Sequence, residues 1–202
     1  EDPVDIKGWR GLATSHYDLN DFTSSLEAYQ KLSELEGPKC TNQIGTGFNH
    51  LKLARPKVAA SYFEACLRQD ASNEKAINGA AIAADMTGNF KEAQKYHLWL
   101  TGRHPQNVHF RNNFALSLMI AGKPKDAVSE LMKIAFQASA GSKIRQNLAL
   151  AYGLSGDFAA SEEVVGLDLP PEQVTENVNY FKFLYYSKDR DALRSLLLAR
   201  PL

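Results

Sequence analysis

Two histidines in the first third of the chain could do chemistry as a metal-binding pair. His16 and His50 stand 34 residues apart, and imidazole nitrogens are common ligands of zinc and related metals. No carboxylate is spaced to complete such a site, so packing roles are the favoured interpretation of both side chains. The sequence also contains no nucleophile elbow, phosphate-binding glycine loop or HExxH helix. We therefore expect no metal, no cofactor and no enzymatic activity.

The two cysteines, Cys40 and Cys66, are the other candidates for chemistry. Cys40 lies at the start of one predicted helix, and Cys66 lies near the end of the next. Because these two ends meet in an antiparallel helical hairpin, a disulfide is geometrically possible and would indicate an oxidising compartment. A buried free thiol at Cys66 and an exposed one at Cys40 remain the alternative.

The elements that position these residues recur every 34 residues. Helix-breaking turns repeat at this spacing: Asn20-Asp21-Phe22, Ala54-Arg55-Pro56, Gly88-Asn89-Phe90, Gly122-Lys123-Pro124 and Gly156-Asp157-Phe158. Small residues stand at a fixed distance before each turn (Ala13, Gly47, Ala81, Ala115, Ala149) and after it (Ser25, Ala59, Ala93, Ala127, Ser161). Small side chains let two crossing helices approach closely. A 34-residue period with alternating small and bulky positions is typical of the tetratricopeptide repeat (TPR).

The predicted fold is therefore all-α, a right-handed superhelical solenoid of TPR hairpins that forms one domain over residues 1–202. Its five repeats span about 6–39, 40–73, 74–107, 108–141 and 142–169, and a degenerate capping hairpin spans 170–202. In the cap, Pro171 starts one helix, and Asp189 or Asp191 opens a last helix through Leu197. Gly45 and Gly47, inside a predicted helix, suggest that another backbone comes near.

Composition excludes two classes of function. The 202 residues carry 23 basic and 23 acidic side chains and a formal net charge of zero, whereas general nucleic-acid binding needs clustered Lys and Arg. No apolar run approaches the 18 residues of a transmembrane helix. The chain does not begin with Met, so we expect a processed or trimmed N-terminus and infer nothing from the lack of a targeting segment.

The first helices of TPR hairpins line a concave groove, and their residues form rows from hairpin to hairpin. The first row is Arg10, Ile44, Asn78, Asn112 and Gln146, and the second row is Gly11, Gly45, Gly79, Asn113 and Asn147. Apolar residues follow further inward, among them Phe48, Ile82, Leu116, Met119 and Leu150. A carboxamide is both donor and acceptor, so the amides could hold a peptide backbone while the apolar residues take its side chains.

The predicted peptide-binding residues are Asn78, Asn112, Asn113, Gln146, Asn147, Phe48, Ile82, Leu116, Met119 and Leu150. In the alternative interpretation, the asparagines cap or bridge neighbouring hairpins and the apolar residues belong to the core. Acidic C-terminal tails are disfavoured as ligands, because Arg10 is the only cationic residue in the first row and glycines occupy clamp-type places.

Two sequence elements carry a closer resemblance. The run Arg111-Asn112-Asn113-Phe114-Ala115-Leu116, followed by Ile144-Arg145-Gln146-Asn147-Leu148, is similar to TadD, the family of TPR lipoproteins of bacterial tight-adherence (Tad, or Flp) pilus systems. Asp168-Leu169-Pro170-Pro171, with Val174, Asn177 and Tyr180, resembles the C-terminal part of that family. The similarity covers about residues 74–185.

The resemblance implies a pilotin or assembly factor that holds a segment of the outer-membrane secretin. It implies a lipoprotein on the periplasmic face of the outer membrane, with its lipid anchor outside residues 1–202. Two other functions stay open on the sequence: a TPR adaptor for protein–protein interactions, cytoplasmic and unrelated to pili, and an accessory subunit of a cell-envelope enzyme.

Overall fold

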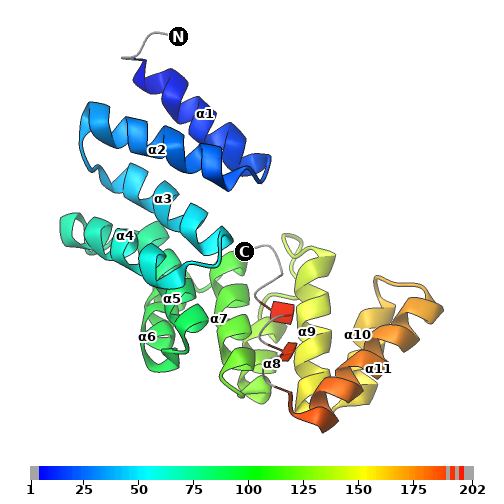
Figure 1. Cartoon of the computed structure of the whole chain (residues 1–202). Coiled ribbons are helices and arrows are strands. Elements are labelled where there is room, and N and C mark those ends of the chain that lie inside the picture. The colour runs from blue at the N-terminus through cyan, green and yellow to red at the C-terminus, as the bar shows by residue number, and fades with distance from the viewer. Residues whose placement is uncertain (1–4, 190–191, 194–195, 198–202) are drawn as a thin grey trace. The chain divides into compact units, whose positions relative to one another are not determined.

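A computed structural model describes residues 5–189, 192–193 and 196–197 (Figure 1). The described part of the chain forms eleven α-helices and no strand, which confirms the predicted all-α class. The helices are α1 (Ile6–Asp18), α2 (Phe22–Glu36), α3 (Cys40–Lys52), α4 (Pro56–Gln69), α5 (Glu74–Thr87), α6 (Phe90–Arg103), α7 (Val108–Ile120), α8 (Pro124–Met132), α9 (Ser142–Ser155), α10 (Phe158–Gly166) and α11 (Pro171–Ser187).

Local chemistry fixes where these helices start. Asp21, Asn73 and Asp157 each accept a hydrogen bond from the backbone N–H three residues later, which satisfies an otherwise unpaired donor at the helix N-terminus. Proline occupies the first helical position of α4, α8 and α11, where its missing N–H costs nothing. The first helices of the five hairpins begin at the starts of the five predicted repeats, and α3 at Cys40 and α9 at Ser142 do so without a side-chain cap.

All five turns at the 34-residue spacing adopt the left-handed backbone conformation. Gly88, Gly122 and Gly156 have φ of 81°, 78° and 89°, and Asn20 has φ of 61°. Asn visits this region more readily than other residues with a side chain. Ala54 also lies there, at φ of 54°, although alanine disfavours that conformation. The turn that lacks both Gly and Asn therefore keeps the same geometry.

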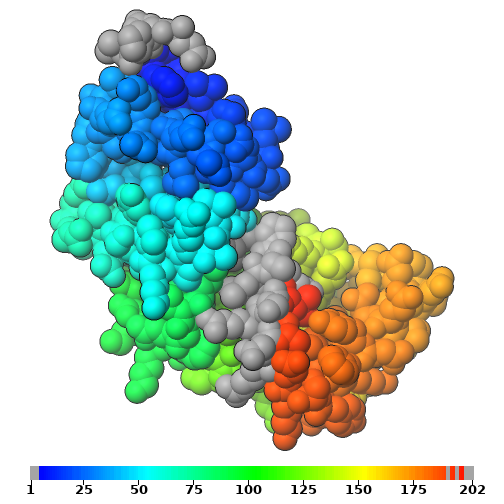
Figure 2. Space-filling model, viewed as in Figure 1, coloured from blue at the N-terminus to red at the C-terminus, as the bar shows by residue number. Residues whose placement is uncertain are grey.

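The chain divides into two compact units, residues 1–96 and 97–202, and the boundary falls inside α6. Each unit is described by itself. In the first unit, α1 packs on α2, α2 on α3, α3 on α4 and α4 on α5, and Figure 2 shows the first of these helices in blue and cyan in that order. In the second unit α7, α8, α9, α10 and α11 follow one another in the same way.

The small residues predicted at the helix crossings are buried. The alanines and serines on both sides of the turns have 0 % exposure: Ala13, Ala81, Ala115, Ala149, Ser25, Ala59, Ala93, Ala127 and Ser161. The two serines add a bond that alanine cannot form, because Ser25 Oγ donates to the Ala13 carbonyl at 2.7 Å and Ser161 Oγ to the Ala149 carbonyl at 2.8 Å. Close approach therefore holds the two helices of each hairpin together.

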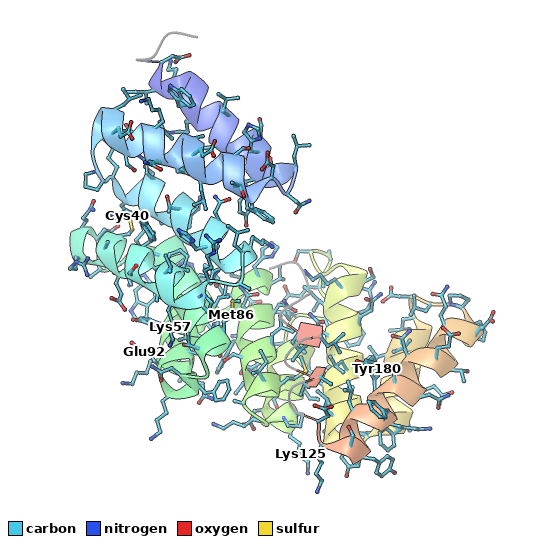
Figure 3. The ribbon with its side chains drawn as sticks, in the orientation of Figure 1. Cys40, Lys57, Met86, Glu92, Lys125 and Tyr180 are labelled. Atoms are coloured by element: carbon cyan, nitrogen blue, oxygen red, sulfur yellow. A yellow bond between two sulfur atoms is a disulfide. The ribbon has the colours of Figure 1, made fainter. Side chains whose placement is uncertain are left out.

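Cys40 and Cys66 form a disulfide in the first unit, with their Cα atoms 4.5 Å apart (Figure 3). The bond joins the start of α3 to the end of α4, the two ends that an antiparallel hairpin brings together. The free-thiol alternative is therefore not the state that this structure contains.

The capping region contains one complete helix, α11, which packs on α9 and α10 through Val174, Val178, Phe181 and Leu184. Phe181 lies directly on Gly153 of α9, where a Cβ atom would come within 2.6 Å of the Phe181 Cβ. The last helix predicted from Asp189 or Asp191 lies partly outside the described residues. Of that segment Leu197 is described, and its side chain is buried.

Candidate peptide-binding surface

In the second unit, the predicted amides of the first row and the second row meet each other. Asn147 Nδ2 of α9 donates to Asn112 Oδ1 of α7 at 2.8 Å, and the two side chains are 0 % and 9 % exposed. This bond joins the first helices of neighbouring hairpins. For this pair the structure therefore contains the bridging arrangement that the sequence left as an alternative, and peptide contact by either amide stays a prediction.

The remaining predicted amides keep some exposed surface. Asn78 on α5, Asn113 on α7 and Gln146 on α9 are all half-buried. Asn78 lies in the first unit, and the other two lie in the second. These three side chains are the amides of the predicted set that a ligand could reach without displacing the packing of a helix.

Most of the predicted apolar contacts are core residues in this structure. Ile82 is 4 % exposed, and Leu116, Met119 and Leu150 are likewise buried. Phe48 differs, since it is only partly buried and its ring meets Phe63 edge-on with the centroids 5.2 Å apart. Helical periodicity placed four of these residues in one inward row and Met119 in the row beside it, but of the five only Phe48 offers appreciable surface to a ligand.

Two glycines of the second row, Gly45 and Gly79, receive aromatic rings from the preceding hairpin. A Cβ atom on Gly45 would lie 2.1 Å from Cζ of Tyr29, and a Cβ atom on Gly79 would lie 2.3 Å from Phe63. Gly47 also faces Phe63, at 2.7 Å. The expectation that Gly45 and Gly47 admit another backbone was wrong, because they admit rings instead. Gly45 and Gly79 are packing positions, and no side chain could project from them into a groove.

The only cation of the first row is already paired. Arg10 on α1 contacts Glu36 at the end of α2 at 2.6 Å, and the Glu36 side chain is only 5 % exposed. Lys39 and Asn42 also donate to Glu36, and with Arg10 they lower the pKa of this carboxyl to about 2. Since Arg10 is neutralised within its own hairpin, the first row, whose five residues are all described, offers no free cation to an acidic tail.

A second ion pair joins the two sequence elements that resemble the TadD family. Arg145 on α9 donates from Nε and Nη2 to both oxygens of Asp168, at 2.8 Å and 2.6 Å. This bidentate geometry holds the pKa of Asp168 below its usual range. Arg145 opens the Arg-Gln-Asn-Leu element and Asp168 precedes Leu-Pro-Pro, so the fold brings two elements far apart in sequence into direct contact.

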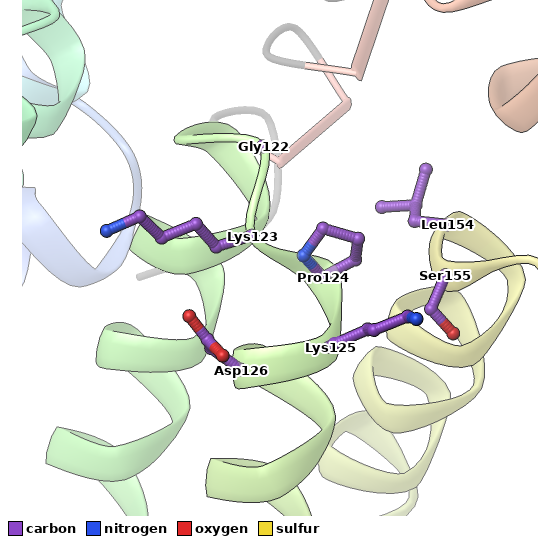
Figure 4. Close-up of a pocket in the computed structure, with 7 residues that line it drawn as sticks. All are labelled: Gly122, Lys123, Pro124, Lys125, Asp126, Leu154 and Ser155. Carbon is purple, nitrogen blue, oxygen red and sulfur yellow. The ribbon is translucent and has the colours of Figure 1, made fainter.

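Two open pockets lie at equivalent places in the two units. In the first unit, a pocket of about 400 Å³ is lined by Ala54–Val58 and by Met86 and Thr87. In the second unit, a pocket of about 340 Å³ is lined by Gly122–Asp126 and by Leu154 and Ser155 (Figure 4). The two sets of residues are two repeat lengths apart. The pockets are thus a product of the repeat geometry, formed where a turn meets the end of the next first helix.

The histidines considered as a metal pair have other roles. His16 Nδ1 lies 3.2 Å from Asp21, and His50 stacks on Tyr62 with the ring centroids 5.5 Å apart. Burial lowers the pKa of His50, which favours an uncharged packing ring. Within the described residues, no group of three His, Cys, Asp or Glu side chains is placed to hold a metal ion. In the same part of the chain, no helix combines the length and hydropathy needed to cross a membrane.

No protein-family model and no curated protein matches the sequence. Solved structures do match. PilW, described as a widely conserved type IV pilus biogenesis factor, has a TM-score of 0.76 at 18 % identity over 89 % of this chain and 83 % of PilW. Pseudomonas aeruginosa pilF has a TM-score of 0.70 at 13 % identity, over 96 % of this chain and 90 % of pilF.

A third match is YrrB, described as a TPR protein with an unusual peptide-binding site. Its TM-score is 0.63 at 19 % identity, over 91 % of this chain and 95 % of YrrB. At these identities the similarity concerns the fold alone. Together with the 34-residue period and the observed hairpins, it shows that this chain has the all-helical fold of the tetratricopeptide-repeat proteins.

Proposed function

We propose that this protein is a non-catalytic scaffold that binds a peptide segment of a partner protein through the first helices of its hairpins. The observation that carries this proposal is the TPR fold with half-buried side chains on the first helices of each unit: Phe48 and Asn78 in the first unit, and Asn113 and Gln146 in the second. Amides can bond a peptide backbone, and the ring can cover an apolar side chain. The buried Asn112–Asn147 pair would then position α7 and α9 and leave ligand contact to the residues beside it.

The partner that we favour is a segment of the outer-membrane secretin of a Tad/Flp pilus machine, which would make the protein a pilotin or assembly factor. The resemblance of the Arg-Gln-Asn-Leu and Leu-Pro-Pro elements to TadD supports this partner, as does the ion pair that joins them. The structural similarity to two pilus proteins, PilW and pilF, agrees with it at the level of the fold.

The proposed location is the periplasmic face of the outer membrane. The Cys40–Cys66 disulfide supports an oxidising compartment and argues against the cytoplasmic adaptor. Attachment through a lipid would depend on a residue outside residues 1–202, so it is tested separately, by metabolic lipid labelling of the protein in its own cell.

Calorimetric titration with fragments of an outer-membrane secretin of a Tad/Flp pilus system tests the partner. We expect one fragment to bind, and the double variant Asn113→Ala with Gln146→Ala to weaken its affinity by about 1–3 kcal/mol through lost hydrogen bonds. Gln30→Ala is the control, because Gln30 is an exposed amide on α2, a second helix.

The possible outcomes separate the partner from the surface. If no secretin fragment binds, the secretin proposal fails, and a pull-down from envelope extracts then decides between a general adaptor and an enzyme accessory subunit. If a fragment binds but the double variant retains full affinity, the first helices of the second unit are not the binding surface.

A further inference from the structure

The face of α11 where a second helix would pack is largely open. The 34-residue period places Phe183 in register with the small residues before the turns, such as Ala115 and Ala149. Those alanines are 0 % exposed because the second helix of their hairpin lies against them, whereas Phe183 is 57 % exposed and Tyr186, one turn later, is 71 % exposed. The described residues that follow α11 therefore leave this face of it largely uncovered.

Three leucines after α11 are nevertheless held against the second unit. We define Leu193, Leu196 and Leu197 as the leucine stripe. Leu197 is 1 % exposed, and the other two are half-buried. Asp189 starts a helical turn there, because its Oδ1 accepts from the Ala192 N–H at 2.8 Å and its carbonyl accepts from the Leu193 N–H at 3.1 Å. Leucines at this spacing share one face of a helix, so the leucine stripe needs an apolar surface to cover it.

The inward row of the first helices becomes more buried along the chain. At its start Thr14 is exposed and Phe48 is half-buried. From there on every member is buried: Ile82 is 4 % exposed, Leu116 is 7 % exposed and Leu150 is 0 % exposed. These positions face the concave side of a TPR hairpin, which the helices of the hairpins themselves leave open. The exposed start of the row shows that open state, so the buried leucines of the second unit need a cover.

Helix α7 shows that the cover comes from an additional element. Its seven successive residues from Phe114 to Ile120 are all buried, and two helical turns point in every direction around the axis. Helices α8 and α9 lie against two sides of α7, and the His97 ring of α6 stacks on Phe114 with the centroids 5.7 Å apart. The inner side of α7, which carries Leu116, remains to be covered.

The leucine stripe is within reach of that inner side. Eight residues separate Asp189 from Leu197, which corresponds to about 12 Å at the rise of an α-helix. Packed helices lie about 8–10 Å apart, and α11 packs directly on α9. In Figure 1 the described residues of this segment are drawn in red between α8 and α9. The segment can therefore run from the end of α11 back along the first helices of its own unit.

We propose that the leucine stripe occupies the inward row of the second unit as an internal ligand, and that the external partner is a helical segment with leucines at the same spacing, which displaces it. Apolar residues at i, i+3 and i+4 are the anchors of a helix that lies in a groove. The affinity for the partner is then reduced by the small fraction of molecules in which the stripe has left its place. The internal contact stands by itself, whereas the class of partner rests on the proposed function.

A labelled peptide of residues 188–202 tests the internal contact by fluorescence anisotropy. The full-length double variant Leu193→Asp with Leu197→Asp should bind this peptide about tenfold more tightly than wild type, or better still, because its own stripe no longer competes. Leu167→Asp is the matched control, since Leu167 is 58 % exposed in the same unit; it should bind as weakly as wild type. If circular dichroism shows the aspartate variant unfolded, Leu193→Ala with Leu197→Ala takes its place.

A nitroxide spin label on the peptide locates the contact. Methyl resonances of Leu116 and Leu150 should broaden more strongly than those of Leu131 on α8, a second helix. Equal peptide affinity of wild type and both double variants would overturn the proposal. Stronger broadening at Leu131 would also overturn it, because the stripe would then lie elsewhere.

The external partner is tested by competition. A secretin fragment that binds the double variant should displace the labelled peptide, and a fragment that binds without displacing it would overturn the proposed class of partner. Peptide binding by the double variant, together with no binding of any secretin fragment, would support the internal contact and reject the secretin as partner. The two proposals can therefore fail separately.

Discussion

The two units solve the same packing problem with different residues. In the first unit, the second helix of a hairpin places a ring on the next first helix, and that helix carries glycine: Tyr29 meets Gly45, and Phe63 meets Gly79. In the second unit, the equivalent bulky positions are His97 and Leu131, and the second row carries Asn113 and Asn147 instead. Asn147 uses the available space for a buried bond to Asn112.

The difference shows that the residue type in the second row depends on the bulky residue that the preceding hairpin packs against it. A Cβ atom on Gly11, in the hairpin of α1 and α2, would meet nothing within 4 Å. The glycines at positions 45 and 79 are therefore needed for volume, and the one at position 11 is not. The first unit also contains a covalent bond between two helices, the disulfide. The Asn112–Asn147 contact of the second unit is a hydrogen bond. Three sets of substitutions test this difference between the units.

The largest expected effect comes from removing the disulfide with Cys40→Ser and Cys66→Ala. The bond closes a loop with a sequence separation of 26 residues, and loops of this length correspond to about 3 kcal/mol of stabilisation in the chain-entropy model. Hydrogen exchange should show the loss in α3 and α4 and leave α9 and α10 of the second unit unchanged. Equal loss in both units would show that they do not unfold separately.

The next effect tests the glycine positions. Gly79→Ala should destabilise the protein by about 1–3 kcal/mol, because overpacking against the fully buried Phe63 ring outweighs the better helix propensity of alanine. Adding Phe63→Leu should recover part of the loss, since the smaller side chain gives room. Gly11→Ala, in the same row, should stabilise the protein slightly. Urea unfolding measures all three, and a stabilising Gly79→Ala would disprove the volume argument.

The smallest effect tests the asparagine bridge. Asn147→Ala should cost about 1–2 kcal/mol, because it leaves the buried Asn112 carbonyl without the donor that it has now. The double variant Asn112→Ala with Asn147→Ala should lose less stability than the sum of the two single variants, since it leaves no buried amide of the pair without its partner. Simple additivity in urea unfolding would mean that the two amides contribute independently.

Much of the fold was predictable because the repeat fixes it. The turns, the helix starts at Cys40 and Ser142 and the small buried residues such as Ala115 all follow from the 34-residue period. Ala54 shows the limit of residue preferences, since the left-handed turn is kept without Gly or Asn. Backbone hydrogen bonds hold that geometry, from Ala54 N–H to the Leu51 carbonyl at 3.0 Å and from Arg55 N–H to the His50 carbonyl at 2.8 Å.

The candidate surface was less predictable, because periodicity assigns a face but not the depth of a side chain on it. Met119 and Phe48 were assigned to the same inward surface, yet Met119 is 1 % exposed and Phe48 is only half-buried. Gly45 was interpreted as a place where another backbone comes near, and Gly45 and Gly79 as clamp-type places without a cation. The available signal was the bulky residue 16 positions earlier, Tyr29 before Gly45 and Phe63 before Gly79, which a search confined to first helices does not consider.

The fit between rings and glycines also limits how such a chain can evolve or be engineered. If the hairpin of α3 and α4 were copied and inserted after α8, Leu131 would face Gly45 and leave a void, and Phe63 would meet Asn147 where no room exists. Hairpins of equal length are therefore not interchangeable, because each one fits the side chains of its present neighbours. Any lengthening of this array has to change both sides of a junction together.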